Sequence, residues 1–194
     1  MKVSGVIRDQ FPDSASSHSL PLWVRFRSWS YLQTFGHKIE HGRGIRIGKH
    51  SQIKITDGGK LTLGDRVILD DFSFVQLTKP SPSVELGDYV VLGRSSIIAA
   101  KNKICIGRYT QIAPFCQILD QEHGINKGEL IVNQRSNLGE VVIGEDCWLG
   151  TGVTVLSNTI IGNGSIIGAG SVVKGSVPAN QIWAGVPARF IRDR

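Results

Sequence analysis

A histidine beside two carboxylates is the cluster in this sequence with the most obvious chemical use. The segment reads DQEHG, with Asp120, Glu122 and His123, and no other histidine follows His50. An imidazole has a pKa of about 6.5 and can accept a proton near neutral pH, and a neighbouring carboxylate can fix its tautomer. We therefore take His123 as a candidate general base and Asp120 or Glu122 as its orienting group. The alternative is that all three are ordinary polar loop residues.

The chain around this cluster repeats with a period of six residues. From Ile143 to Pro178 it reads IGEDCW, LGTGVT, VLSNTI, IGNGSI, IGAGSV and VKGSVP. An aliphatic residue opens each hexad, and a small or β-branched residue comes four places later. Neither an α-helix nor an ordinary half-buried strand has this period. Hexads of this kind predict a parallel β-helix, an all-β solenoid whose triangular coils each contain three short strands.

The same phase recurs upstream, in blocks that open at Ile47, Leu63, Leu86 and Ile106. Between the blocks the phase slips near 78–84, at 100–105 and, most widely, at 119–142. Where the six-residue phase slips, we expect a loop to leave a corner of the solenoid. Long loops on a rigid scaffold commonly carry function. His123 lies in the longest of them, which we call loop 119–142.

This pattern divides the chain into three segments. Residues 1–44 precede the hexads, residues 45–178 form the β-helix with loop 119–142, and residues 179–194 form a C-terminal extension. The stretch LPLWVRFRSWSYLQTF mixes aromatic residues with arginines and fits a short amphipathic helix. It is a candidate cap for the open end of the solenoid, which repeat proteins need. The alternative is a surface for a membrane-borne partner or a lipid-linked substrate.

Composition fits one compact cytoplasmic domain. The chain has 194 residues, of which 41% are hydrophobic and 20% charged. It lacks the roughly 18 apolar residues of a transmembrane helix and the apolar region of a signal peptide. The net charge is +6, but no nucleic-acid-binding motif accompanies it. We expect no nucleic-acid partner; a solvated basic surface, a small phosphorylated ligand and an anionic glycan all remain open.

The three cysteines do not form a metal or disulfide pattern. Cys105, Cys116 and Cys147 contain no CxxC pair, and the last two occupy the fifth position of their hexads. Small residues that point inward belong at that position, so we expect structural thiols. Neither a disulfide framework nor a zinc site is indicated.

Several of these motifs together resemble a known family. The phased hexads, the DQEHG segment before the last coils and the ending IGAGSVVKGSVPANQIWAGVPARFIR are similar to the left-handed β-helix, hexapeptide-repeat acyltransferases, in particular the maltose, galactoside and polysaccharide O-acetyltransferase branch. The resemblance covers about residues 45–192. It implies a homotrimer with each active site between two subunits. It also implies transfer of an acetyl group from acetyl-CoA, without a metal, to a hydroxyl of a sugar or of a polysaccharide or lipopolysaccharide precursor, with His123 as general base.

Matching the family motif residue by residue assigns the donor side. The corner around Trp148, Gly150 and Thr151 would hold the oxyanion through backbone N–H groups. Lys174 stands one place before the position where many relatives carry their lysine, and this chain has Gly175 there. The residues implied along the coenzyme A path are Trp148, Thr151, Ala169, Lys174, Gly175, Arg189 and Arg192.

The acceptor side departs from the family pattern. Galactoside and maltose acetyltransferases hold their sugar with an Asn and an acidic residue, where this chain has Gly93 and Lys101. We therefore expect a charged, nucleotide-linked or lipid-linked sugar, met by Lys101 and Lys103, in place of a neutral disaccharide.

Three alternative functions remain open. The first is an N-acetyltransferase that modifies an amino sugar or an antibiotic, since an amine acceptor needs the same base and donor site. The second is a non-catalytic trimeric scaffold. The third, a gamma-type carbonic anhydrase, needs three histidines around zinc and is disfavoured because the other histidines precede the main coils.

Overall fold

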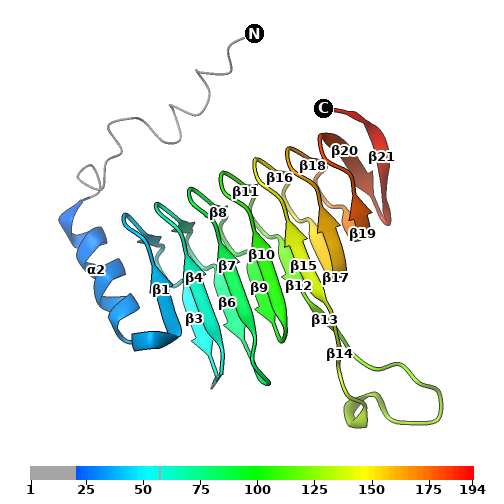
Figure 1. Cartoon of the computed structure of the whole chain (residues 1–194), viewed down its shortest axis with the longest axis horizontal. Coiled ribbons are helices and arrows are strands. Elements are labelled where there is room, and N and C mark those ends of the chain that lie inside the picture. Colours follow the sequence, from blue (N-terminus) through cyan, green and yellow to red (C-terminus); the bar gives the residue numbers. More distant parts are fainter. Residues whose placement is uncertain (1–20, 57) are drawn as a thin grey trace.

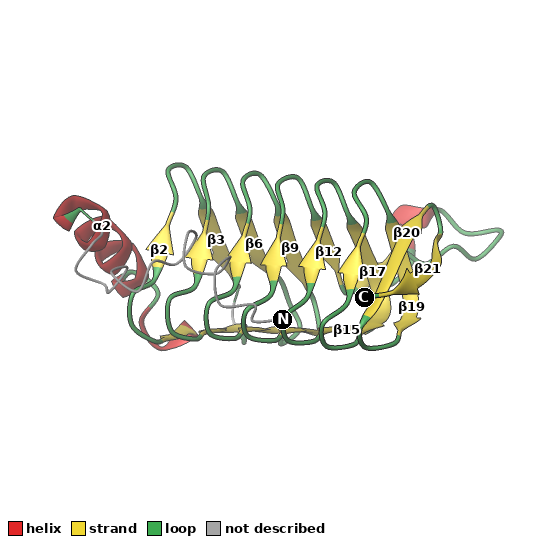
Figure 2. Cartoon of the chain, turned by 90° about the horizontal axis from the view of Figure 1, so that it is seen from above, coloured by secondary structure: helices red, strands yellow, loops and turns green. Residues whose placement is uncertain are grey.

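The computed structural model describes residues 21–56 and 58–194 and shows a parallel β-solenoid with a helix at its N-terminal end (Figure 1). Each coil contributes one short strand to each of three faces that run along the coil axis (Figure 2). The all-β solenoid expected from the hexads is confirmed, and it is consistent with the left-handed fold of this repeat.

The strands of each face stack in register. Face 1 contains β1 (Ile39–His41), β4 (Lys60–Leu63), β7 (Ser83–Leu86), β10 (Lys103–Ile106), β15 (Glu140–Ile143) and the second halves of β17 (Thr154–Ile161) and β19 (Val172–Val177). Face 2 contains β2 (Arg46–Ile47), β5 (Ile68–Leu69), β8 (Val91–Leu92), β11 (Gln111–Ile112), β16 (Trp148–Leu149), β18 (Ile166–Ile167) and β20 (Gln181–Gly185), followed by the antiparallel β21 (Ala188–Asp193). Face 3 contains β3 (Gln52–Ile55), β6 (Phe74–Leu77), β9 (Ile97–Ala100), β12 (Gln117–Leu119) and the first halves of β17 and β19.

The remaining elements lie outside the three faces. They are α2 (Leu22–Gln33), the 3₁₀ turns η1 (Gly36–Lys38) and η2 (Ile131–Asn133), and the hairpin strands β13 (Gln121–Glu122) and β14 (Asn137–Leu138). We name the corners by order: the first corner joins faces 1 and 2, the second joins faces 2 and 3, and the third joins faces 3 and 1.

The interior is filled by columns of one aliphatic residue per coil. Along face 1, residues in register stack from Leu63 through Leu86, Ile106 and Ile143 to Ile161, and none is more than 3% exposed. Burial of each such side chain contributes about 1.5–3 kcal/mol. The six-residue period is therefore the period at which the chain returns an aliphatic side chain to the prism interior.

The cysteines follow the hexad pattern. Cys116 and Cys147 are buried and Cys105 is half-buried, and all three thiols are free. Burial raises the pKa of each of the three thiols above its usual value. The expectation of structural thiols is confirmed for the two inward positions.

The corners explain the recurring Gly-Asp pairs of the hexads. At the first corner, Asp65 Oδ1 accepts a hydrogen bond from Arg43 N at 2.8 Å, and Asp88 Oδ1 accepts one from Asp65 N at 2.7 Å. Each carboxylate thus ties its corner to the coil before it. A Cβ on Gly64 would lie 2.6 Å from Asp88 N, so a larger residue would force the coils apart.

Helix α2 covers the N-terminal end of the solenoid. Val24, Ser28 and Leu32 are its buried residues. Ser28 Oγ accepts a hydrogen bond from Ile47 N at 3.0 Å, and Tyr31 Oη accepts one from Ile53 N at 2.9 Å. These side chains satisfy backbone groups that the first coil would otherwise leave unpaired at an open edge. Helix α2 therefore occupies the position that a cap of the open end would take.

The boundaries of the solenoid differ from those expected. Strand β1 already pairs with β4, so the first coil begins at Ile39 and not at residue 45. At the other end, β20 pairs in parallel with β18, so the extension 179–194 continues face 2. Residues 1–20 of the first segment lie outside the described residues. None of the helices in the described part of the chain is long and apolar enough to cross a bilayer.

Candidate functional site

The hairpin that carries His123 leaves the coil at the third corner. Strands β13 and β14 pair in antiparallel orientation, and Gly139 N donates to Asp120 O at 2.8 Å, so the two ends of loop 119–142 meet. The rest of the loop projects from the solenoid (Figure 1). His123 follows β13 directly and is exposed. The loop thus holds the candidate base where a substrate can reach it.

Asp120, one of the two carboxylates expected to orient His123, faces the coil. It is 0% exposed, its two oxygens lie 2.8 and 3.1 Å from Lys101 N, and Oδ2 lies 2.8 Å from Asn102 N. Burial raises the pKa of Asp120, although these backbone N–H groups act in the opposite direction. Ser157 Oγ donates to Asp120 O at 2.9 Å. Asp120 therefore fastens the root of the hairpin to the coils before and after it.

Glu122, the second carboxylate, pairs with Lys174, whose Nζ lies 2.8 Å from Glu122 Oε1. Both side chains are partly exposed, so the pair is worth about 0–1 kcal/mol. The contact nevertheless places Lys174 and the following Gly175 beside the root of the hairpin. None of the described residues forms a hydrogen bond with the His123 ring, so within one chain neither carboxylate orients it.

Two side chains that the sequence did not single out organise the loop. Gln134 Oε1 accepts a hydrogen bond from Asn126 N at 2.7 Å and holds the tip together. Ser136 Oγ accepts one from Lys101 Nζ at 2.8 Å. Hydrogen bonds made by the side chains of an aperiodic loop leave no repeating signal in the sequence. As a result, Lys101 from the coil before and Lys174 from the coil after flank the hairpin root.

A groove of about 690 Å³ runs along face 2. Trp148, 53% exposed, lies in it, and Arg46 pairs there with Asp70 at 3.8 Å (Nη2 to Oδ1). Gly93 forms part of the wall, where a Cβ would lie 2.6 Å from Ile112 O and would not fit. The groove is lined by Arg46, Ile68, Asp70, Val91, Gly93, Gln111, Ile112, Ala113, Pro114 and Trp148.

Thr151 and Ala169 lie at the second corner, beside this groove. They belong to consecutive coils, whose corners are joined by a hydrogen bond from Gly170 N to Thr151 O at 2.9 Å. Both side chains are exposed. Thr151 and Ala169 therefore follow one another along the coil axis, and Trp148 lies in the same coil as Thr151.

The two arginines assigned to coenzyme A lie on β21, at the C-terminal end of face 2. Arg189 and Arg192 are exposed, and each guanidinium donates to a backbone oxygen of its own strand at 2.9 Å. The first bonds Ala188 O and the second Asp193 O. Their charge is not neutralised by these contacts and remains available to an anion.

The expected site residues therefore fall into two groups on different sides of the prism. His123, Asp120, Glu122, Lys101, Lys174 and Gly175 gather at the third corner, whereas Gly93, Trp148, Thr151, Ala169, Arg189 and Arg192 lie along face 2 and its edges. The third corner is the edge opposite face 2 in a triangular coil, and the hairpin points away from the solenoid (Figure 1). Within one chain, the two groups of expected site residues therefore lie apart. Among the described residues, no three His, Cys, Asp or Glu side chains are arranged as metal ligands.

Residues 140–175 match the family model described as bacterial transferase hexapeptide (six repeats). A protein of Escherichia coli K12 that bears the name colanic acid biosynthesis acetyltransferase WcaF is 33% identical over 164 residues, which are 84% of this chain and 72% of WcaF. The chain belongs to the hexapeptide-repeat transferase family.

Other hexapeptide-repeat transferases add detail. The Escherichia coli K12 protein named for lipopolysaccharide biosynthesis O-acetyl transferase WbbJ is 42% identical over 120 residues, 58% of each chain, so this chain spans little more than half of that relative. Among solved structures, AntD, an N-acyltransferase from Bacillus cereus in complex with dTDP-4-amino-4,6-dideoxyglucose and coenzyme A, superposes with a TM-score of 0.74 at 22% identity, over 86% of this chain and 88% of AntD. That likeness supports the fold.

Proposed function

We propose that this hexapeptide-repeat transferase is an acetyl-CoA-dependent O-acetyltransferase that modifies a hydroxyl of a sugar or of a polysaccharide or lipopolysaccharide precursor. The observation that carries the proposal is the exposed, unpaired imidazole of His123, held by a hairpin whose root Asp120 fastens to the coil. Its family membership and the names of WcaF and WbbJ support the same chemistry.

In the proposed reaction, a ring nitrogen of His123 takes the proton from the acceptor hydroxyl as its oxygen attacks the thioester carbonyl carbon. Backbone N–H groups near Trp148, Gly150 and Thr151 stabilise the oxyanion of the tetrahedral intermediate. The intermediate then collapses, the C–S bond breaks, and the imidazolium returns its proton to the sulfur. The products are the acetyl ester and coenzyme A, without a covalent enzyme intermediate or a metal.

The donor and acceptor would use the two residue groups described above. Thr151 and Ala169 would border the pantetheine arm, and Arg189 and Arg192 would meet the phosphates or the adenine. Lys174 would either join them or, while paired with Glu122, hold the hairpin in place. On the acceptor side, Gly93 would give clearance in the face 2 groove. Lys101 would stand at the hairpin root, which favours a charged, nucleotide-linked or lipid-linked acceptor.

We propose a homotrimer, because its geometry completes this site. Rotation about an axis parallel to the coil places the third corner of one subunit beside face 2 of the next. His123 of one subunit then faces Trp148 and Gly93 of its neighbour.

The assay is acceptor-dependent release of coenzyme A from acetyl-CoA, over sugars, nucleotide sugars, amino sugars and antibiotics. His123→Ala should lower kcat/KM by about 10²–10⁴, while the matched variant His50→Ala, an exposed histidine at the second corner, should leave it unchanged. An amino sugar or antibiotic as the best acceptor would indicate N-acetyl transfer. Full activity of His123→Ala would refute the role of His123, and failure to bind acetyl-CoA would favour a non-catalytic scaffold.

The shared site has a separate test. Ala169→Trp should block the binding of acetyl-CoA along the groove of the chain that carries the substitution, while leaving the hairpin of that chain intact. When His123→Ala and Ala169→Trp chains are mixed in equal amounts, about a quarter of the sites should be active. Each site takes its hairpin from one subunit and its groove from another, and each of the two is intact in half of the cases. A mixture as inactive as the separate variants would place both halves in one chain.

A further inference from the structure

Helix α2 has two apolar faces, and the solenoid covers one of them. The buried face consists of Val24, Ser28 and Leu32. On a second face, about a third of a turn away, Leu22, Phe26 and Trp29 follow the spacing of neighbours on one helix surface. Leu22 is 78% exposed, Phe26 67% and Trp29 56%. Capping explains the first face and leaves the second without a partner among the described residues.

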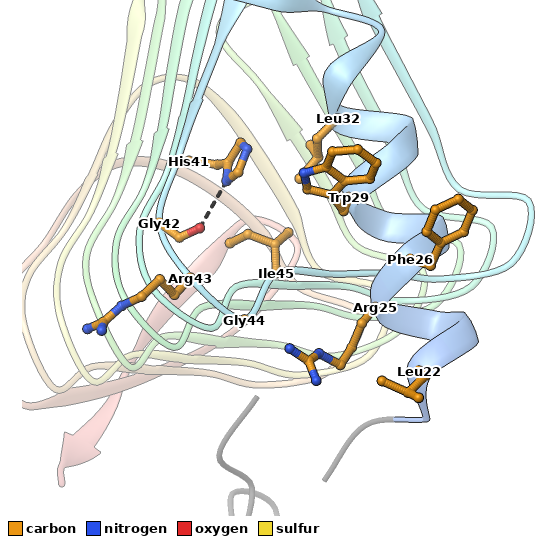
Figure 3. Close-up of a pocket in the computed structure, with 10 residues that line it drawn as sticks. All are labelled: Leu22, Arg25, Phe26, Trp29, Leu32, His41, Gly42, Arg43, Gly44 and Ile45. Carbon is orange, nitrogen blue, oxygen red and sulfur yellow. Dashed lines mark hydrogen bonds between the residues drawn. The ribbon is translucent and has the colours of Figure 1, made fainter. Parts of the chain in front are cut away.

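This second face borders a hollow of about 560 Å³ between α2 and the first turn of the coil (Figure 3). Leu22, Phe26 and Trp29 form the helix side, and Ile45 lies on the coil side. The rings of Phe26 and Trp29 lie 6.0 Å apart. The apolar surface is therefore continuous, and it is hollowed where α2 meets the coil.

Arginines surround the aromatic side chains, and the helix carries no acidic residue. Arg25 and Arg43 line the hollow, and the Arg27 guanidinium lies 5.8 Å from the Trp23 ring centre. Trp23 is itself 58% exposed. The Arg25 guanidinium forms no hydrogen bond or ion pair with any part of the chain that the structure describes.

The nearby carboxylates neutralise only part of this charge. Glu40 pairs with Lys60 at 2.9 Å, and Asp70 pairs with Arg46 at 3.8 Å. Asp65 pairs with Arg43 at 3.4 Å, but the Arg43 side chain is still 92% exposed. The surface as a whole remains cationic, so we expect its binding partner to be an anionic surface.

We propose that this face of α2, formed by Leu22, Trp23, Phe26 and Trp29 with Arg25 and Arg43, docks on an anionic phospholipid bilayer. Tryptophan and phenylalanine flanked by arginine are the composition of helices that lie in the headgroup region. The aromatic rings enter the interface, while the guanidiniums meet lipid phosphates. Helix α2 lies at one end of the rod (Figures 1 and 2), and the Leu22, Phe26 and Trp29 side chains are more than half exposed.

This inference does not depend on acetyl transfer. If the chain forms the proposed trimer, three copies of the face lie at the same end and act together on one membrane. The hairpins that carry His123 would then stand at a fixed height above the bilayer.

The test is co-sedimentation of the full chain with vesicles of phosphatidylcholine alone or of phosphatidylcholine and phosphatidylglycerol in equal parts. We expect binding to the anionic vesicles, weakening with salt, and quenching of tryptophan emission by brominated acyl chains. Phe26→Ser with Trp29→Ser should weaken binding by about tenfold or more, and Arg25→Glu by about fivefold or more. The control Phe72→Ser removes an aromatic side chain that is 55% exposed on the second corner and should change nothing.

Three results would overturn the proposal. The first is equal binding to neutral and anionic vesicles, or none to either. The second is wild-type binding by the Phe26, Trp29 double variant. The third is a change of oligomeric state in that variant, measured by light scattering without lipid, because the face would then be a contact between copies. Coenzyme A release by the double variant in detergent-free buffer should stay at the wild-type level, which separates this proposal from the proposed activity.

Discussion

Asp120→Asn should weaken the fold at the root of the hairpin that carries His123. The carboxylate accepts hydrogen bonds from two backbone donors, Lys101 N at 2.8 and 3.1 Å and Asn102 N at 2.8 Å. Asparagine keeps one acceptor oxygen and turns its NH₂ group toward the second donor. One buried N–H then lacks a partner, which costs about 1–3 kcal/mol of unfolding free energy. Asp120→Ala removes both acceptors and should cost more.

The assay is denaturant unfolding at fixed protein concentration, since an oligomer's stability depends on it. The matched control is Asp65→Asn, at an exposed first corner, where one oxygen accepts one backbone N–H from Arg43. Asparagine can keep that bond, so we expect a smaller loss. Equal losses for the two variants, or a wild-type midpoint for Asp120→Asn, would refute the account of Asp120 as a buried two-donor anchor.

The difference in unfolding free energy between wild type and Asp120→Asn should depend on pH, and the shifted pKa of Asp120 gives the sign. Burial raises the pKa of Asp120 above its usual 3.8, so the folded chain holds that proton more tightly than the unfolded chain. The stabilisation from this group is complete below pH 3.8 and is lost as pH rises through the folded-state pKa. The advantage of wild type over Asp120→Asn should therefore narrow from acid pH toward neutrality.

Three further changes test the cap, the corners and the thiols. Tyr31→Phe leaves Ile53 N without its 2.9 Å acceptor and should lower the unfolding free energy by about 1–3 kcal/mol, measured by denaturant unfolding; no loss would mean that the edge is solvated. Gly64→Ala places a Cβ 2.6 Å from a backbone nitrogen and should destabilise by about 2 kcal/mol or more; a wild-type melting temperature would contradict the close stacking. Iodoacetamide, followed by peptide mass spectrometry, should label Cys105 before the buried Cys116, and the reverse order would contradict the assigned burial.

The sequence predicts the solenoid well because its fold is local and repeated. Each hexad independently returns an aliphatic residue such as Leu86 to the interior, so a single chain shows the same rule many times. Loop 119–142 was predictable because it interrupts the six-residue repeat. Cys116 and Cys147 followed from their hexad positions alone. The start of the coil was misplaced because β1 is too short to show a full hexad.

The candidate site was less predictable, since its contacts join residues far apart in the chain. Asp120 stands next to Glu122 and His123 in the sequence, but its carboxylate turns to Lys101 and Asn102. The pairing of Glu122 with Lys174 joins residues separated by 52 positions. Proximity in the sequence therefore did not predict the partners of Asp120 and Glu122. The separation of the hairpin from the face 2 groove follows from the corner at which the loop emerges, which only the complete coil reveals.

The closure of the hairpin at its root has an evolutionary consequence. The coils on either side of it pair directly, β10 with β15 and β12 with β17, and Gly139 N meets Asp120 O. The scaffold is therefore complete without the inserted segment, so lengthening, shortening or replacing residues 121–138 need not disturb it. Related solenoids can therefore differ in the length and sequence of this segment while the coils that carry it stay the same.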